Sequence, residues 1–170
     1  MINKNNVHLL RFINIILLAV TIIFQYNCNF SLKISSANPM LPICLLVAIC
    51  MFCSELTAAL SGLVVGVFID STAATIQGFN AIMFLIIGLA TSLIVKHLFN
   101  NNVFSSIALC AIACTIYLIV RWLTGFAFSL SFTENITYLI RFAFPSVLYS
   151  AIFTLPFYFI EKYLYQKLYK

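Results

Sequence analysis

The side chains that could carry out chemistry in this 170-residue chain are few and lie far apart in the sequence. His8 precedes the first apolar run, His97 follows the fourth, and Asp70 closes the third. Acid–base or nucleophilic catalysis needs such groups within hydrogen-bonding reach of one another. Neither a His-Glu-x-x-His nor a Gly-x-Ser-x-Gly motif occurs in the sequence. We therefore predict no catalytic residues, and an intramembrane enzyme is the weakest of the functions considered.

The cysteines offer redox or metal chemistry only if they lie outside the apolar segments. Cys50-x-x-Cys53 on a strand–helix turn would suggest redox chemistry, and together with a second such pair it would suggest a zinc site. Five of the six cysteines, all but Cys28, fall within predicted helices, where a thiol is usually small apolar filling. Cys110 and Cys114 are one helical turn apart, placed to pack against Cys50 or Cys53. We predict neither a disulfide framework, nor a metal site, nor a cofactor.

The composition is that of a membrane protein. Hydrophobic residues make up 64% of the chain and charged residues 8%, with a mean hydropathy of +1.10, whereas soluble domains carry about 25% charged residues. The net charge of +5 does not indicate nucleic acid, because in such a chain the position of each charge matters more than the sum. The prediction is an all-α integral membrane protein that forms one domain over residues 1–170 and is surrounded by the lipid bilayer.

Charged and polar residues divide the chain into six apolar segments, each near the length of about 20 residues that a membrane-spanning helix needs. The predicted spans are residues 9–26, 39–53, 55–72, 79–95, 103–123 and 142–160. The first has the length of a signal peptide, but no Ala-x-Ala site follows it, and we interpret it as a retained helix.

Basic residues set the predicted orientation, because they concentrate on the cytoplasmic side. With both termini cytoplasmic, six of the nine basic residues face inward (Lys4, Arg11, Lys96, Lys162, Lys167 and Lys170) and three face outward (Lys33, Arg121 and Arg141). An odd number of spans would place the basic C-terminal tail outside.

The longest predicted loop, "GFAFSLSFTENITYLI", lies between the fifth and sixth spans. Its alternating Phe126, Phe128, Leu130 and Phe132 have the period of an extended segment with one apolar face. Such a segment would lie on the outer membrane surface or against a partner. A continuation of the fifth helix, bent at Gly125, is the alternative.

The third span keeps two acidic residues, Glu55 and Asp70, with fourteen uncharged residues between them. These cover about 21 Å of helix, less than the roughly 30 Å of the hydrocarbon core. At least one carboxylate must therefore lie within the membrane edge and face protein, which requires a partner or a function. Glu55, Ala59, Gly62, Gly66 and Asp70 share one helical face, and the small residues on it let another helix approach closely, within the chain or from a second copy.

Three further residues complete the predicted site. Arg121, at the outer end of the fifth span, is the proposed counter-ion of Asp70. Gly78 can take a positive φ in a tight turn, and Asn80 can cap the fourth helix. Beside this structural interpretation, Asp70, Gln77 and Asn80 could line a small polar pocket at the outer surface.

These residues carry a family resemblance. Gly62, Gly66 and Asp70 form a G-x-x-x-G-x-x-x-D run, and Gly78, Asn80 and Ala81 open the next helix. The pattern resembles the MreD family of rod shape-determining proteins, as do the chain length, the basic end of the fourth span ("IVKHLFNNN") and the six spans.

The resemblance implies a non-catalytic, multi-pass scaffold in the bacterial cytoplasmic membrane. It would bind a single-span MreC protein and connect MreB filaments to peptidoglycan synthesis by RodA and its transpeptidase, with homo-oligomers left open. The family also looks similar in fold to the substrate-binding subunits of energy-coupling-factor transporters. The alternative function is therefore a micronutrient-binding subunit with the outer polar groups as its pocket.

Overall fold

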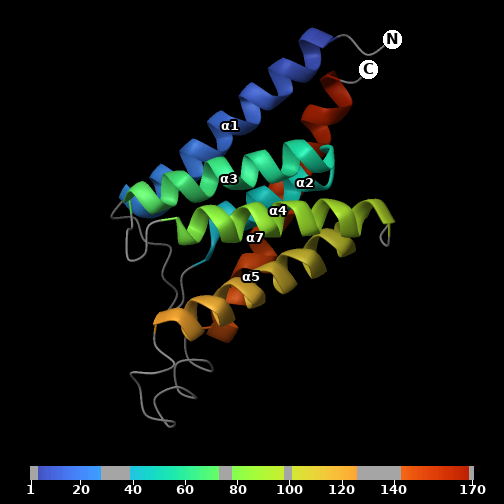
Figure 1. Cartoon of the computed structure of the whole chain (residues 1–170). Helices are drawn as coiled ribbons and strands as arrows, with labels where there is room; N and C mark the ends of the chain where they lie inside the picture. Colours follow the sequence, from blue (N-terminus) through green and yellow to red (C-terminus); the bar gives the residue numbers. More distant parts are fainter. Residues whose placement is uncertain (1–3, 28–38, 73–77, 98–100, 126–142, 169–170) are drawn as a thin grey trace.

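The computed structural model describes residues 4–27, 39–72, 78–97, 101–125 and 143–168. Within these ranges the chain forms six α-helices and no β-strand (Figure 1). The helices are α1 (Lys4–Asn27), α2 (Leu41–Cys50), α3 (Glu55–Thr72), α4 (Phe79–His97), α5 (Val103–Gly125) and α7 (Phe144–Leu168). The all-α prediction is confirmed. Gly125 of the predicted loop (residues 125–140) ends α5, and the rest of that loop lies outside the described residues, as do Cys28, Lys33, Gln77, Arg141 and Lys170.

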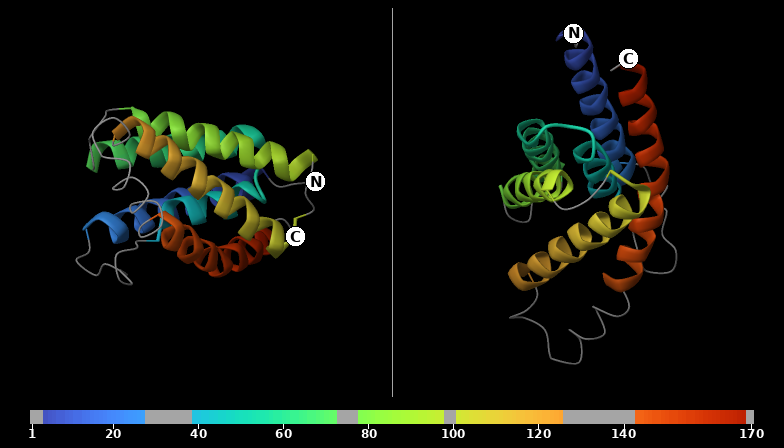
Figure 2. Two further views of the ribbon diagram at one scale, coloured as in Figure 1. Left: turned by 90° about the horizontal axis from the view of Figure 1, so that it is seen from below. Right: turned by 90° about the vertical axis from the view of Figure 1, so that its right-hand side faces the viewer.

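Four of these helices are long and apolar enough to cross a bilayer: Glu55–Thr72, Phe79–His97, Val103–Thr124 and Phe144–Lys167. The chain is therefore a helical membrane protein. α3 and α4 lie side by side as an antiparallel pair, while α1 begins and α7 ends next to each other at one end of the molecule (Figures 1 and 2).

The short helix α2 lies at the centre of the fold. All ten of its residues are buried, and it contacts each of the other five described helices. Its sequence, LPICLLVAIC, has no polar face to turn toward water, so burial on every side is the stable arrangement. Ten residues rise only about 15 Å, half of a hydrocarbon core. The helix is therefore shorter than the predicted segment of residues 39–53: it ends at Cys50, and residues 51–53 turn into α3.

The last helix is longer than predicted. The sequence places its end at Ile160, but α7 continues to Leu168. Glu161 lies on the same helical face as Thr154 and Tyr158, and all three are buried. Lys162, the next residue, is exposed. Glu161 and Lys162, from which the sequence predicted the end of the helix, thus lie on its buried face and its exposed face, respectively. The other predicted boundaries differ from the observed ones by a few residues at helix ends, and 55–72 agrees with α3.

Candidate functional site: the α3–α4 hairpin

The predicted small-residue face of α3 packs within the chain, against α4. A Cβ atom on Gly62 would lie 2.8 Å from the carbonyl carbon of Phe84, and one on Gly66 would lie 2.6 Å from the backbone nitrogen of Ala81. From the other side, a Cβ on Gly88 of α4 would lie 2.6 Å from the carbonyl oxygen of Ala58. Non-bonded carbon atoms prefer separations of about 3.5–4.0 Å. The two backbones are thus in direct contact along a seam that only glycine permits, with Ala59 also buried on α3.

Asp70 closes one end of this seam by capping the next helix. Its Oδ1 accepts hydrogen bonds from the backbone N–H of Asn80 at 3.2 Å and from Nδ2 of Asn80 at 2.8 Å, and its Oδ2 accepts one from the N–H of Ala81 at 3.0 Å. These two N–H groups belong to the first turn of α4, where no intrahelical acceptor exists and a negative charge is favoured. The predicted turn at Gly78 is present, with a φ of +84°. The cap itself comes from Asp70, so the prediction that the Asn80 side chain caps α4 is wrong.

The Asn80 side chain instead links Asp70 to α5. Its Oδ1 accepts a hydrogen bond at 2.8 Å from the hydroxyl of Tyr117, which is buried. Nη1 of Arg121, one turn further along α5, lies 3.4 Å from the same hydroxyl. The predicted direct ion pair of Arg121 with Asp70 is not formed: in the described part of the chain, the ion pair is that of Glu55 and Lys96. Asp70 needs no cation here because three N–H donors already satisfy it.

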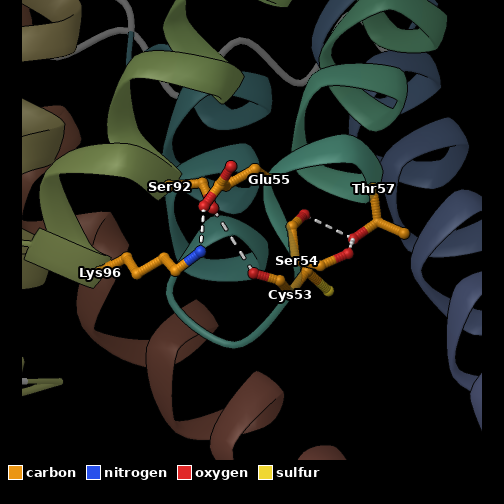
Figure 3. Close-up of polar contacts among 6 residues, drawn as sticks. All are labelled: Cys53, Ser54, Glu55, Thr57, Ser92 and Lys96. Carbon is orange, nitrogen blue, oxygen red and sulfur yellow. Dashed lines mark hydrogen bonds and ion pairs between the residues drawn. The ribbon is translucent and has the colours of Figure 1, made fainter.

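The ion pair closes the opposite end of the hairpin (Figure 3). Nζ of Lys96, in the last turn of α4, donates to Oε1 of Glu55 at 2.5 Å, and the lysine side chain is 64% exposed. Nearby, the hydroxyl of Ser92 lies 3.5 Å from the carbonyl oxygen of Cys53, and the hydroxyls of Ser54 and Thr57 are hydrogen-bonded at 3.0 Å. Both acidic residues of α3 therefore face protein partners, one at each end of the helix.

A second group of polar contacts joins α2 to its neighbours. The N–H of Met40 donates to Oγ of Ser150 on α7 at 2.9 Å, and the N–H of Leu41 donates to Oε1 of Gln25 on α1 at 3.0 Å. Sγ of Cys44 donates to the carbonyl oxygen of Ser150 at 3.2 Å. The short helix thus has its first N–H groups satisfied by side chains of other helices, as α4 has.

Three cysteines, Cys44, Cys110 and Cys114, lie beside this second group of contacts. Sγ of Cys110 lies 3.8 Å from Sγ of Cys44 and 4.0 Å from Sγ of Cys114, and all three side chains are buried. The sequence predicted contact with Cys50 or Cys53, whereas the structure places Cys44, in the first half of α2, beside Cys110. Cys53, predicted to be helical, lies in the turn before α3. Among the described residues, no three His, Cys, Asp or Glu side chains are grouped to hold a metal ion.

Several of the contacting residues gave little signal in the sequence. Tyr117 could have been noticed one turn before Arg121, but aromatic residues are common in this chain. Ser150, Asn14 and Glu161 are buried polar groups of α7 and α1, and no motif marks them. The candidate catalytic groups do not converge: the exposed His97 ends α4, whereas Asp70 caps its beginning.

The arrangement defines a class: a helical membrane protein in which a G-x-x-x-G-x-x-x-D face forms an internal hairpin. The described ranges contain no assembled catalytic centre. Residues 6–168 match the family model of the rod shape-determining protein MreD. Because the match covers almost the whole chain, the protein belongs to the MreD family. Comparisons with curated proteins and with solved structures gave no match. The family is one of shape-determining membrane proteins.

Proposed function

We propose that the protein is a non-catalytic scaffold of the bacterial cell-elongation machinery, which binds an MreC-like single-span protein in the cytoplasmic membrane. Membership of the MreD family carries this proposal. The hairpin adds support, because backbone contact along the glycine seam and the Asp70 cap make α3 and α4 a rigid pair. A rigid pair is the kind of element on which a partner helix can be positioned.

The scaffold acts by contact, within the bilayer. Through the MreC-like partner it links cytoplasmic MreB-type filaments to the peptidoglycan synthesis of RodA and its transpeptidase. The polar groups at the Asp70 end support a structural role for that end, since Asp70, Asn80 and Tyr117 bind one another. No specific observation favours the alternative of a micronutrient-binding transporter subunit.

Affinity purification of the tagged protein from native membranes, followed by mass spectrometry, tests the proposal. We expect wild type to recover an MreC-like single-span protein, and Gly66→Leu and Asp70→Ala to lose it because both disturb the hairpin. Ile152→Ala is the matched control, since this α7 side chain is 62% exposed and lies outside the hairpin. Recovery of ATPase subunits with an integral coupling protein would replace the scaffold by the transporter function.

A multi-pass topology with both termini in the cytoplasm completes the proposal. The adjacent positions of the start of α1 and the end of α7 support an even number of crossings (Figure 1). Reporter fusions that fluoresce only in the cytoplasm, placed at either terminus, should both be active. Activity at one terminus alone would contradict the topology.

A further inference from the structure

Two polar side chains are buried between the first and the last helix, away from the hairpin. Asn14 of α1 is 3% exposed and Glu161 of α7 is 1% exposed. The two side chains lie within hydrogen-bonding reach of each other. Even so, Oδ1 of Asn14 and Oε1 of Glu161 have no hydrogen-bond partner. Both orphan atoms are acceptors, so the pair lacks a donor.

The surroundings supply no positive charge among the contacts that the structure describes. Glu161 interacts electrostatically with Cys50, the last residue of α2, where the helix dipole is negative and disfavours a carboxylate. Tyr158, one turn earlier on α7, donates its hydroxyl to the carbonyl oxygen of Asn101. The exposed Lys162 directs its Nζ over the Tyr158 ring, 5.9 Å from the centroid. Among the side chains that the structure describes, an ionised Glu161 would therefore have no counter-ion, and a buried carboxylate without one is costly in a membrane.

We propose that the Glu161–Asn14 pair is a buried proton-binding site. The carboxylate takes one proton from the aqueous phase and becomes a neutral carboxylic acid. Its O–H donates to Oδ1 of Asn14, while the amide Nδ2–H of Asn14 donates to the other carboxyl oxygen. A single proton thus satisfies both orphan acceptors and removes the charge.

A proton fits the site better than a metal ion does. Hard cations such as Ca²⁺ require about six or more oxygen ligands, whereas the structure shows two unsatisfied oxygens here. Nor do the described residues contain a group of three metal-ligating side chains. The neutral acid–amide pair would then join α1 to α7 through two hydrogen bonds.

Infrared spectroscopy of the full-length protein in lipid nanodiscs tests the proposal directly, because a protonated carboxylic acid has a carbonyl stretch that a carboxylate lacks. At neutral pH we expect this band in wild type, its loss in Glu161→Gln and its retention in Glu55→Gln, whose carboxylate is ion-paired and partly exposed. Asn14→Leu should keep the band and move it to higher frequency, since the acid loses its acceptor. A wild-type spectrum without the band, or a band that persists in Glu161→Gln, would overturn the proposal.

Thermal unfolding gives a second readout. The amide of Glu161→Gln can donate where the acid O–H donates, so we expect its Tm to stay within about 2 °C of wild type, equivalent to a small change in stability for a chain of this size. Glu161→Leu should lower the Tm by more, because Asn14 loses both partners. Replacing sodium by choline in the buffer should leave the wild-type Tm unchanged. Sodium-dependent stabilisation that disappears in Glu161→Gln would show a metal-ion site and contradict the proton.

Discussion

The contacts of α3 with α4 and of α2 with α7 join helices in opposite ways. In the α3–α4 hairpin, glycines bring the backbones together and charged side chains act only at the ends. Between α2 and α7 the contact is made by small polar side chains, with Ser150 binding Met40 and Cys44. Both contacts nevertheless satisfy the first N–H groups of a helix with a side chain from another helix.

The difference shows that the type of capping side chain depends on how deeply the capped helix end is buried. Lipid gives helices no hydrophobic reason to associate, so backbone contact and interhelical hydrogen bonds must hold them together. Half-buried Asp70 can keep its charge at the end of the hairpin, where it stabilises the positive end of α4. At the start of α2, Leu41 and the rest of the helix are buried. There the neutral side chains of Ser150 and Gln25 accept the hydrogen bonds of the backbone N–H groups without the cost of a buried charge.

The largest effect should come from closing the glycine seam. Gly66→Leu places a side chain where even its Cβ would overlap the backbone of Ala81, so we expect the loss to be at least about 3 kcal/mol, the upper range for overpacking. The readout is the Tm of the detergent-solubilised protein, which should fall by roughly 6–12 °C.

Gly78→Ala is the control for this substitution. No atom lies within 4 Å of a Cβ at Gly78, whose φ is +84°, so the alanine meets backbone strain alone, about 1–2 kcal/mol. If Gly66→Leu were no less stable than Gly78→Ala, the hairpin would not depend on backbone contact.

The next largest effect should follow removal of the charged cap. Asp70→Ala leaves the N–H groups of Asn80 and Ala81 without their acceptor, and we expect a loss of about 2 kcal/mol, the upper range for a helix cap. Asp70→Asn, which keeps one acceptor oxygen, should lose less. The measurement is again the Tm, and equal values for the two variants would show that the carboxylate's second oxygen and its charge contribute nothing.

The neutral cap should matter less. Ser150→Ala removes the acceptor of the Met40 N–H, and we expect a loss of about 1–2 kcal/mol for an unsatisfied buried donor. Ser61→Ala provides the control, because the Ser61 hydroxyl bonds only within its own helix, to the carbonyl of Ala58. Similar Tm values for Ser150→Ala and Ser61→Ala would mean that the Ser150 hydroxyl adds nothing to the apolar packing of α2 against α7.

The same contrast explains what the sequence could predict. A glycine seam can be predicted because its residues recur at a fixed spacing in the sequence. Gly62, Gly66 and Asp70 are four residues apart and therefore share one helical face. The all-α membrane fold and the α3 boundaries follow from apolar segments interrupted by charges. The partner of that face, α4, could be one of several helices in the sequence and is specified only by the tight turn at Gly78.

The α2–α7 contact leaves no such spacing. Ser150 is one of several serines in apolar segments. Nothing near it in the sequence indicates that its partner is Met40, which lies 110 residues away. Opposite charges suggest a pair of Asp70 with Arg121, whereas the actual donors are backbone N–H groups, which every residue except proline carries. The charge of Glu161 suggests a helix end, because charge alone does not reveal which face of a helix is buried.

The smallest effect should come from the charged end of the hairpin that is open to solvent. Glu55 and Lys96 form an ion pair whose lysine is mostly exposed, and such pairs are weak and screened by salt. A double-mutant cycle of Glu55→Gln and Lys96→Met should therefore give a coupling in Tm near the error of measurement, which disappears at high salt. A coupling that persists at high salt would mean that this end is shielded from water and contributes to closure as Asp70 does. The expected weak coupling would instead assign the stability of the hairpin to its glycine seam and its Asp70 cap.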